Sequence, residues 1–430
     1  MLRRMETTGS FPEHLLGRQT EANDRDRRLL FDLVHGVLRW RGRLDYIIAH
    51  FSKLPLEKIE PAVLDILRLG AYQLLFLSRI PARAAVDESV RLAGRYPRHV
   101  KGYVNALLRS VAREGAGVAF PDPQRDPVAY LAAWHSHPPW LVQRYLERLG
   151  FEEAERLLAA NNALPPLTVR TNTLRTSRPH LAARLAGEGV EAVPTALSPE
   201  GLVLKGAGDP ARLASFQEGL FQVQDEAAQL VSHLVAPRAG QAVLDACAGR
   251  GGKTLHLAQL MEGLGEVVAA DCDQRKLEEL AGAAARLGAA NVATLVHDAT
   301  TPLEGRRFER VLLDAPCTGT GVIRRHPDLK WRKRPEDIQR LAGLQLTMLE
   351  AVAGSVAKGG VIVYAACSLE PEEGEELVGR FLMGRADFRL EDASEVLGQK
   401  APGPGPYLRT WPHQNGGSRD GFFAARLKRV

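Results

Sequence analysis

Two cysteines each come directly after an apolar run of the kind that forms a buried strand. Cys317 lies in DAPCTGTG (314–321), and Cys367 ends the run VIVYAAC (361–367). If the two runs are neighbouring parallel strands, both thiols face the same edge of the sheet, where ligands bind. A thiolate there can add to carbon-6 of a cytosine, so that carbon-5 becomes able to attack a methyl group, and the second thiol can assist release of the product. Two inert thiols that only pack in the core are the alternative.

Four aspartates stand at the ends of successive predicted strands: Asp245, Asp271, Asp298 and Asp314. Asp271 ends the run EVVAAD, where a carboxylate can accept hydrogen bonds from both hydroxyls of a ribose. Asp298 would then face the adenine amino group, and Asp314 would lie near the reaction centre, where it could hydrogen-bond the base. A ribose site without a pyrophosphate cradle predicts S-adenosylmethionine as the cofactor. Each aspartate taken singly could instead cap a turn or a helix.

The first of these strands leads into a glycine-rich loop, CAGRGGK (247–253), and then into a helical pattern. Glycines let backbone N–H groups approach a ligand at a helix N-terminus. Gly249, Gly251 and Gly252 and the backbone of Cys247 could therefore line the cofactor. A phosphate-binding P-loop is excluded because a cysteine stands at its first glycine, and a dinucleotide fingerprint lacks its third glycine. Lys253 is expected to favour a thiolate, whereas Cys272 is expected only to pack.

These residues need a sheet to position them, and from residue 241 onward short apolar runs alternate with amphipathic helical segments. The pattern predicts a parallel, doubly wound sheet, and hence a Rossmann-like α/β domain over 238–430. The predicted strands are 242–246, 266–271, 293–298, 310–316 and 361–367, and the predicted helices include 275–287 and 337–356.

The rest of the chain divides into a helical domain and a small mixed lobe. Apolar residues recur at helical spacing over 24–114, with prolines between the periodic stretches, which predicts an all-α domain over 1–120. A stretch rich in glycine and proline, 115–127, predicts a boundary, with a linker over 121–137. An α+β lobe is predicted over 138–237, with helices at 141–149 and 152–160, strands at 167–172, 190–195 and 201–205, and a helix opened by Ser177.

Composition narrows the class of protein further. The 430 residues include four cysteines, with no CxxC pair and no histidines at zinc spacing, which argues against a disulfide framework and against a metal site. The N-terminus has no apolar signal region, and no apolar run approaches the length of a membrane span. A cytoplasmic monomer with reduced thiols and no membrane partner is expected. The net charge of +5 is compatible with a nucleic-acid partner.

Three stretches resemble the RNA cytosine-carbon-5 methyltransferases of the Nol1/Nop2/Sun superfamily, and in particular its bacterial RsmB group: DAPCTGTGVIRRHPDLKW (314–331), YAACSLEPEE (364–373) and DGFFAARL (420–427). The resemblance covers nearly the whole chain. It implies that Cys367 is the nucleophile and that Cys317 promotes breakdown of the covalent adduct. It also implies the following cofactor contacts: Cys247, Ala248, Gly249, Arg250, Gly251, Gly252, Lys253, Asp271, Asp298 and Asp314.

The N-terminal runs DLVHGVLRWRGRLD (32–45) and IPARAAVDESVRLA (80–93) resemble the NusB-like RNA-binding domain that begins RsmB proteins. This implies a flipped-out cytosine of 16S rRNA as the target, cytosine 967 in the RsmB group, in RNA or in a small-subunit assembly intermediate. The chain departs from the family pattern at Arg250, Ala366 and Gly374, where proline, threonine and asparagine are usual, and its leading helix looks shortened.

A run of cations follows the first cysteine motif, in RRHPDLKWRKRPED (324–337). Cations can neutralise phosphates while an indole offers a stacking face. The predicted RNA-binding residues are Arg324, Arg325, His326, Lys330, Trp331 and Arg332, and a weaker candidate group is Arg39, Arg41 and Arg43 near Trp40. Solvated charged surface is the alternative for both groups.

Three other functions stay open at this point. The substrate could be tRNA or another rRNA cytosine. It could also be DNA, in which case Cys317 of the Pro-Cys pair would be the nucleophile. A function of another class is a NusB-like RNA-binding factor whose catalytic domain has lost activity; the retained aspartates and thiols argue against it.

Overall fold

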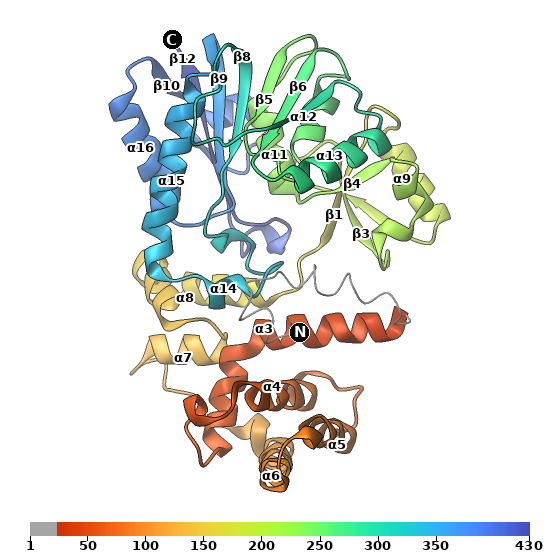
Figure 1. Ribbon diagram of the computed structural model, residues 1–430, viewed down its shortest axis with the longest axis vertical. Helices are drawn as coiled ribbons and strands as arrows, with labels where there is room; N and C mark the ends of the chain where they lie inside the picture. The colour runs from red at the N-terminus through yellow and green to blue at the C-terminus, as the bar shows by residue number, and fades with distance from the viewer. Residues whose placement is uncertain (1–23) are drawn as a thin grey trace. The chain divides into compact units, whose positions relative to one another are not determined.

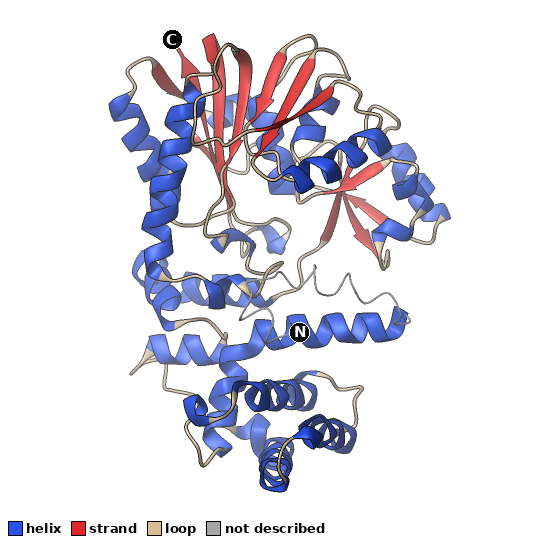
Figure 2. Ribbon diagram, in the orientation of Figure 1, coloured by secondary structure: helices blue, strands red, loops and turns tan. Residues whose placement is uncertain are grey.

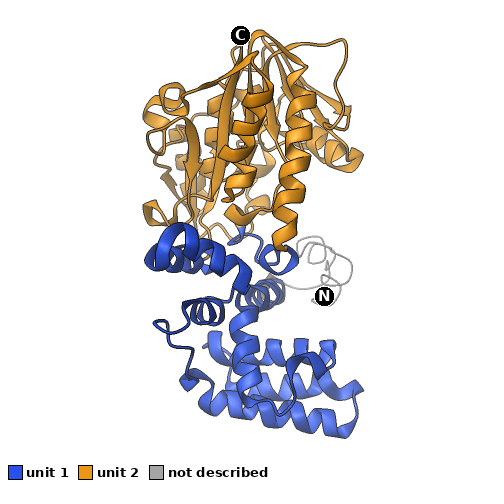
Figure 3. Ribbon diagram, turned by 90° about the vertical axis from the view of Figure 1, so that its left-hand side faces the viewer, with its two compact units in different colours: residues 1–163, 323–333 blue, residues 164–322, 334–430 orange. Residues whose placement is uncertain are grey.

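The computed structural model describes residues 24–430, and its chain forms two compact units (Figure 3). Unit 1 comprises residues up to 163 together with 323–333, and unit 2 comprises 164–322 together with 334–430. The leading segment, for which a shortened first helix was predicted, lies outside the described residues.

The described elements of unit 1 are helices, as the patterns over 24–114 predicted (Figure 2). Apolar side chains at helical spacing form one core, which includes the fully buried Leu44, Ile48, Leu67 and Leu108. The helices are α3 (Asp24–Phe51), α4 (Pro61–Phe76), α5 (Ala82–Leu92), α6 (Arg98–Glu114), α7 (Pro127–Trp134), α8 (Pro139–Asn162) and the short α14 (Leu329–Arg332), with 3-10 turns η1 (Leu56–Lys58), η2 (Ala93–Arg95) and η3 (Gly115–Gly117).

The stretch predicted as a linker, 121–137, contains helix α7. Asp126 caps this helix by accepting a hydrogen bond from the backbone of Ala129 at 2.9 Å, and Pro127 occupies its first turn, where a missing N–H is tolerated. Leu131 is completely buried. The prolines and polar residues that suggested a linker therefore start a helix. Helix α8, predicted at the start of the lobe, also belongs to unit 1, and it is kinked at Gly150, which has a φ of 74°.

The small lobe at the start of unit 2 has the predicted α+β composition. Its four antiparallel strands run in the order β2-β3-β1-β4. Ser177 caps helix α9, as predicted, by accepting a hydrogen bond from the backbone of His180. The elements are β1 (Leu167–Thr171), α9 (Arg178–Gly187), β2 (Glu191–Pro194), β3 (Gly201–Lys205), η4 (Pro210–Arg212), α10 (Ala214–Gln217) and β4 (Phe221–Val223).

The larger sheet of unit 2 confirms the Rossmann-like α/β fold. Strands β5 to β9 pair in parallel, and the order along the main sheet is β10-β12-β9-β8-β5-β6-β7. The strands are β5 (Ala242–Asp245), β6 (Glu266–Asp271), β7 (Val292–Val296), β8 (Phe308–Asp314), β9 (Val356–Ala366), β10 (Phe388–Glu391), β11 (Tyr407–Thr410) and β12 (Phe422–Arg429).

Helices cover both faces of this sheet (Figure 1). Helices α11 (Glu226–Val235), α12 (Thr254–Leu260), α13 (Gln274–Leu287) and α17 (Ala393–Leu397) contribute to the core on one face. Helices α15 (Pro335–Ala353) and α16 (Glu375–Gly384) contribute to the core on the other. The short turns are η5 (Thr320–Val322), η6 (Pro371–Glu373), η7 (Gly398–Lys400) and η8 (Asn415–Gly417).

Two details of the sheet differ from the pattern-based prediction. The sheet is mixed rather than wholly parallel, because β12 pairs antiparallel with β9, and β10 and β11 pair antiparallel with β12. The helix predicted over 337–356 ends at Ala353, and Val356 already begins β9, because an apolar run fits a buried helix end and a buried strand equally well. Within 24–430, every helix is too short or too polar to cross a membrane.

Candidate active site

The pairing of β8 with β9 brings the two cysteines together. Asp314 lies opposite Ala365 in this parallel pair, so the residues just beyond the two strands are neighbours. The backbone N–H of Gly321 donates to the carbonyl of Cys367 at 3.0 Å and holds the first loop against the second strand end. The Sγ atoms of Cys317 and Cys367 are 3.3 Å apart. The predicted proximity of the thiols is therefore present in the structure.

A buried glutamate that the sequence analysis did not single out fastens both cysteine loops. Glu373 is completely buried, and its Oε1 accepts a hydrogen bond from the backbone N–H of Thr318 at 2.9 Å, next to Cys317. Its Oε2 accepts the hydroxyls of Thr318 and of Ser368, the second at 2.5 Å, next to Cys367. The amide of Gln345 donates to Oε1 at 2.9 Å and to the carbonyl of Pro316 at 2.9 Å. One carboxylate thus sets the spacing of the two thiols.

The two thiols differ in their electrostatic surroundings. The hydrogen bond with Cys367 and then burial raise the pKa of Cys317 well above its ordinary value. Cys317 consequently holds its proton and can donate it toward the sulfur of Cys367. A thiol that holds its proton is a poor nucleophile, because the thiolate is the attacking form.

Lys253 and Asp314 form an ion pair beside the thiols. The ammonium of Lys253 lies 2.5 Å from Oδ2 of Asp314 and 5.0 Å from the ring centre of Phe422. Burial opposes the charge of Lys253, but the carboxylate of Asp314, with the thiolate of Cys367 as a further contributor, raises its pKa overall. The lysine therefore stays charged, and the expectation that it favours a thiolate stays a prediction.

A cavity of about 250 Å³ opens at the carboxyl ends of the strands. Asp271, Asp298 and Asp314 line it, and these are three of the four strand-end acids. Both carboxylate oxygens of Asp271 accept backbone N–H groups, Oδ2 from Gly249 and Oδ1 from Asp273, each at 2.9 Å. These bonds fix its orientation, and the remaining lone pairs can accept ribose hydroxyls.

Asp298 forms the turn that the sequence allowed as the alternative, and it also lines the cavity. Its Oδ1 accepts the backbone N–H of Thr300 at 2.9 Å and the hydroxyl of Thr300 at 2.8 Å, which is an Asx turn. The same bonds lower the pKa of Asp298, and the exposed carboxylate stays ionised on the wall of the cavity.

Asp245, the remaining strand-end acid, is 1% exposed and is absent from the cavity lining. Its Oδ2 accepts the hydroxyl of Thr254 at 2.7 Å, which ties the end of β5 to helix α12. Burial raises the pKa of Asp245 to about 7. Asp245 therefore positions the loop between β5 and α12.

Only part of the predicted glycine loop reaches the cavity. Cys247 and Gly249 line it, whereas the guanidinium of Arg250 pairs with Glu279 at 2.5 Å and the carbonyl of Gly252 accepts a hydrogen bond from Arg170 at 2.8 Å. Ala248 is buried and packs with Leu277 and Leu280. Gly251 has a φ of 84°, and a Cβ there would lie 2.6 Å from the side chain of Leu280. This close approach requires glycine.

Several lining residues were missed from the sequence. Cys272, which was expected only to pack, is instead exposed and lines the cavity, because it follows the last residue of β6. Lys276, His297 and Met348 also line it. The position of Cys272 directly after a strand-end aspartate was a usable signal. Taken together, the carboxylates, the glycine turn and the thiols beside them fit a nucleoside cofactor such as S-adenosylmethionine.

The cation run after the first cysteine motif is largely folded into unit 1. Arg324 and Lys330 are each 1% exposed. The ammonium of Lys330 donates to the carbonyl of Arg39 at 2.8 Å and to Oδ1 of Asn162 at 2.9 Å, and the indole N–H of Trp331 donates to the carbonyl of Leu38 at 2.6 Å.

This burial corrects the prediction that Arg324 and Lys330 contact RNA phosphates. Arg39, from the weaker candidate group, is also buried, and its guanidinium donates to the carbonyl of Arg324 at 2.8 Å. Arg325, His326 and Arg332 keep part of their surface exposed, and an RNA-binding role for them stays a prediction. The sequence shows where cations gather but not which of them the fold encloses.

Three family profiles match the chain. The profile described as "16S rRNA methyltransferase RsmB/F" matches residues 232–428, the NusB family matches 1–113, and the "Methyltr_RsmF/B-like, ferredoxin-like domain" matches 137–210.

Curated relatives match over most of their length. The "Probable ribosomal RNA small subunit methyltransferase B" of Bacillus subtilis is 37% identical over 96% of this chain and 92% of its own, and the "Ribosomal RNA small subunit methyltransferase B" of Pseudomonas putida is 39% identical over 95% and 92%. Among solved structures, PH0851 superposes with a TM-score of 0.83 at 28% identity, covering 100% of this chain and 97% of that one. NSun6 from Pyrococcus horikoshii with SFG has a TM-score of 0.61 at 25% identity, covering 68% and 98%.

Proposed function

Because the chain belongs to the ribosomal RNA small subunit methyltransferase B family, we propose that it transfers a methyl group from S-adenosylmethionine to carbon-5 of a cytosine in 16S rRNA. The observation that carries this proposal is the thiol pair, 3.3 Å apart, beside a cavity lined by three strand-end carboxylates.

The residues at the cavity divide into cofactor contacts and reacting groups. Asp271 would hold the ribose hydroxyls, Asp298 would face the adenine, and Cys247 and Gly249 would contact the cofactor from the loop after β5. When bound, S-adenosylmethionine supplies an electrophilic methyl group. Asp314, held by Lys253, lines the end of the cavity that approaches the thiols and is placed to hydrogen-bond the base.

Cys367 is the nucleophile in the proposed reaction. Its thiolate adds to carbon-6 of the cytosine, the carbon-5 to carbon-6 π electrons move to carbon-5, and carbon-5 takes the methyl group. The carbon-5 proton must then leave, and the sulfur to carbon-6 bond must break to regenerate the thiolate of Cys367. Lys253 supports the thiolate at the start and at the end of this sequence.

Cys317 acts in the second half of the reaction. The leading cause of its raised pKa is its hydrogen bond with Cys367. Once Cys367 has become a thioether, that cause is removed, and Cys317 can release its proton to solvent water. The thiolate of Cys317 then accepts the carbon-5 proton, the electrons of that C–H bond re-form the carbon-5 to carbon-6 double bond, and Cys367 leaves as a thiolate.

The roles proposed for Cys367 and Cys317 also distinguish this function from the alternatives. A DNA-type mechanism would make Cys317 the attacking thiolate, and its raised pKa opposes that role. An RNA-binding factor without activity would not need a buried carboxylate to fix the spacing of two thiols. We propose 16S rRNA, as free RNA or as a small-subunit assembly intermediate, as the substrate, with cytosine 967 as the target.

The proposal is tested by incubating the purified full chain with S-adenosylmethionine and either a 16S rRNA transcript or small subunits from cells that lack the enzyme. Bisulfite sequencing then locates 5-methylcytosine. We expect one modified cytosine, at position 967, and none with Cys367→Ala. Methylation of another atom, or full methylation by Cys367→Ala, would overturn the proposal.

A further inference from the structure

A second cluster of ligating side chains lies in unit 2, outside the cavity described above. Glu200 precedes strand β3 of the small lobe, His233 lies in the last turn of α11, and His256 lies on α12. Their ligand atoms all lie within 4.8 Å of one another. Both histidines are buried, His256 completely, and the glutamate side chain is 12% exposed.

The hydrogen bonds of this cluster are incomplete. Nε2 of His233 lies 2.9 Å from Oε2 of Glu200, and the hydroxyl of Ser198 donates to the same oxygen at 3.2 Å. Nε2 of His256 is 4.0 Å from that oxygen, and neither ring nitrogen of His256 has a hydrogen-bond partner. A buried polar group without a partner costs about 1–3 kcal/mol. The hydrogen bond between His233 and Glu200 therefore does not explain why His256 is buried without a hydrogen-bond partner.

We propose that Glu200, His233 and His256 bind a divalent transition-metal ion, with Zn²⁺ as the best match to two imidazoles and one carboxylate. Ligand atoms about 2 Å from a tetrahedral Zn²⁺ are roughly 3.3 Å apart, so separations that lie within 4.8 Å need adjustments of up to about 1.5 Å. The metal occupies the position toward which Nε2 of His256 and Oε2 of Glu200 converge. Three protein ligands leave the fourth position to a small donor such as water.

Arg170 is a buried cation of the same lobe. Its guanidinium donates to Gln259 at 3.2 Å, to Gln224, and to the carbonyl of Gly252 at 2.8 Å. Arg170 is thus held by neutral acceptors, and its charge acts on Glu200 and His256 through space rather than through a hydrogen bond.

A metal here would join separate parts of unit 2. Glu200 belongs to the lobe, whereas His233 and His256 belong to the helices that cover the larger sheet, and α12 begins directly after Lys253. The expected consequence is stabilisation of the lobe against this sheet. The sequence has no histidines at zinc spacing and no metal was expected from it, whereas the three proposed ligands come from three separate segments.

The test uses the full chain carrying Cys317→Ser and Cys367→Ser, so that the thiol pair cannot bind the metal. After chelation, the protein is titrated with Zn²⁺ against a chromophoric chelator, and with Co²⁺ for its visible spectrum. We expect one equivalent of each metal, cobalt d–d bands without thiolate charge-transfer bands, and a rise in melting temperature with Zn²⁺.

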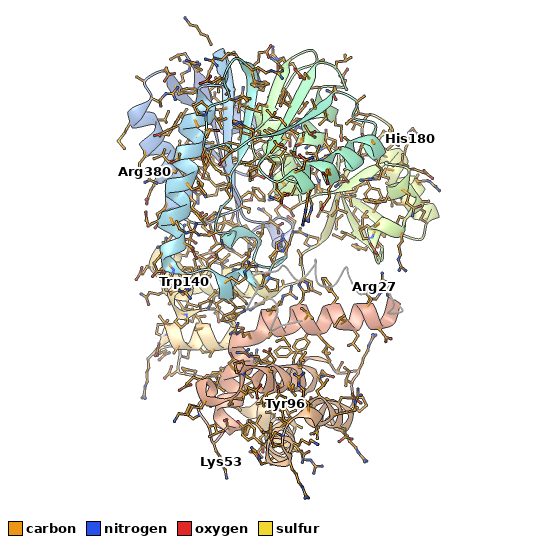
Figure 4. All side chains as sticks on the ribbon, in the orientation of Figure 1. Arg27, Lys53, Tyr96, Trp140, His180 and Arg380 are labelled. Carbon is orange, nitrogen blue, oxygen red and sulfur yellow. The ribbon has the colours of Figure 1, made fainter. Side chains whose placement is uncertain are left out.

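His256→Gln removes the ligand while keeping most of its volume, and it should weaken Zn²⁺ binding at least about tenfold. Glu200→Gln serves the same purpose if His256→Gln does not fold. His180→Gln is the control, because His180 is an exposed histidine of the same lobe (Figure 4). The proposal is overturned if the parent protein takes up no Zn²⁺, or if the His256 and Glu200 variants bind it as the His180 variant does.

Discussion

The sulfur atoms of Cys317 and Cys367 lie 3.3 Å apart although 50 residues separate them in the chain. Two adjacent parallel strands, β8 and β9, end side by side, and Glu373 fastens the loops that follow them. The hydrogen bond with Cys367 and burial raise the pKa of Cys317, and Cys367 is the proposed nucleophile.

The division of roles between the thiols predicts opposite outcomes for their removal. Cys317→Ala should still attack the base but release it slowly, so a covalent complex of protein and RNA should persist on a denaturing gel. Cys367→Ala should form no adduct and no product. The double variant is the control. An adduct that survives loss of Cys367 would contradict the assignment.

The Glu373 network predicts a positioning effect on the reaction. Glu373→Gln replaces an oxygen that accepts two hydroxyls with an amide NH₂, and the spacing of the thiols should change. Because small misplacements of reacting groups are costly, kcat should fall by about 10- to 100-fold. The KM for S-adenosylmethionine should change little, since Glu373 does not line the cavity. Glu376→Gln, at an exposed glutamate of α16, is the matched control, and equal kinetics of the two variants would contradict the role.

The cavity predicts unequal effects of its acids on cofactor binding. Asp271→Asn removes the charge from the carboxylate proposed to hold the ribose, and hydrogen bonds to a charged group contribute about 1.5–3 kcal/mol. The Kd for S-adenosylhomocysteine, measured by calorimetry, should therefore rise by roughly 10- to 100-fold. Asp298→Asn should have a smaller effect because Asp298 is exposed and engaged with Thr300. A larger effect of Asp298→Asn would argue against the proposed ribose contact.

The buried carboxyl of Asp245 predicts a pH dependence of stability. Its pKa is raised from 3.8 to about 7, mainly by burial. The folded protein therefore holds this proton more tightly than the unfolded chain does, and the resulting stability is fully present below pH 3.8 and lost as the pH rises through 7. The full loss is of the order of 4 kcal/mol. Asp245→Asn should flatten this part of the curve of unfolding free energy against pH, as followed by urea denaturation. Parallel curves for the variant and the parent protein would show that Asp245 does not contribute.

The buried and the exposed cations of residues 324–337 predict different effects of substitution on stability and on RNA binding. Lys330→Gln leaves the carbonyl of Arg39 and the amide of Asn162 without their buried donor, and should lower the free energy of unfolding by about 1–3 kcal/mol. It should leave the salt dependence of RNA binding unchanged. Arg332→Gln, at an exposed position, should reduce the slope of log K against log salt by about one. A reduced slope for Lys330→Gln would show instead that Lys330 contacts a phosphate.

Much of the site followed from local patterns. Alternating apolar runs and amphipathic helices predicted the strands β5 to β9 and the positions of Asp271, Asp298 and Asp314 near strand ends, because burial on both faces requires such runs. The two strands that precede Cys317 and Cys367 were expected to be neighbours only if the sheet has the usual methyltransferase order, and the structure has β8 beside β9.

Other features depended on contacts between distant segments. Strand β12 inserts antiparallel beside β9, the linker-like prolines near 127 start a helix, and residues 323–333 join the helical unit although they lie between two segments of the other unit. A residue pattern indicates which side chains are apolar and which are charged, but it does not indicate which residues they contact.

The sequence by itself therefore determined the kind of fold, the acids at the strand ends and the two reactive thiols, because these depend on periodicity and on position relative to a strand. Only the tertiary structure decided that Glu373 spaces the thiols, that Asp245 is a buried positioning group and that Lys330 is enclosed. Those properties arise from desolvation and from hydrogen bonds across long sequence separations, and they exist only once the chain has packed.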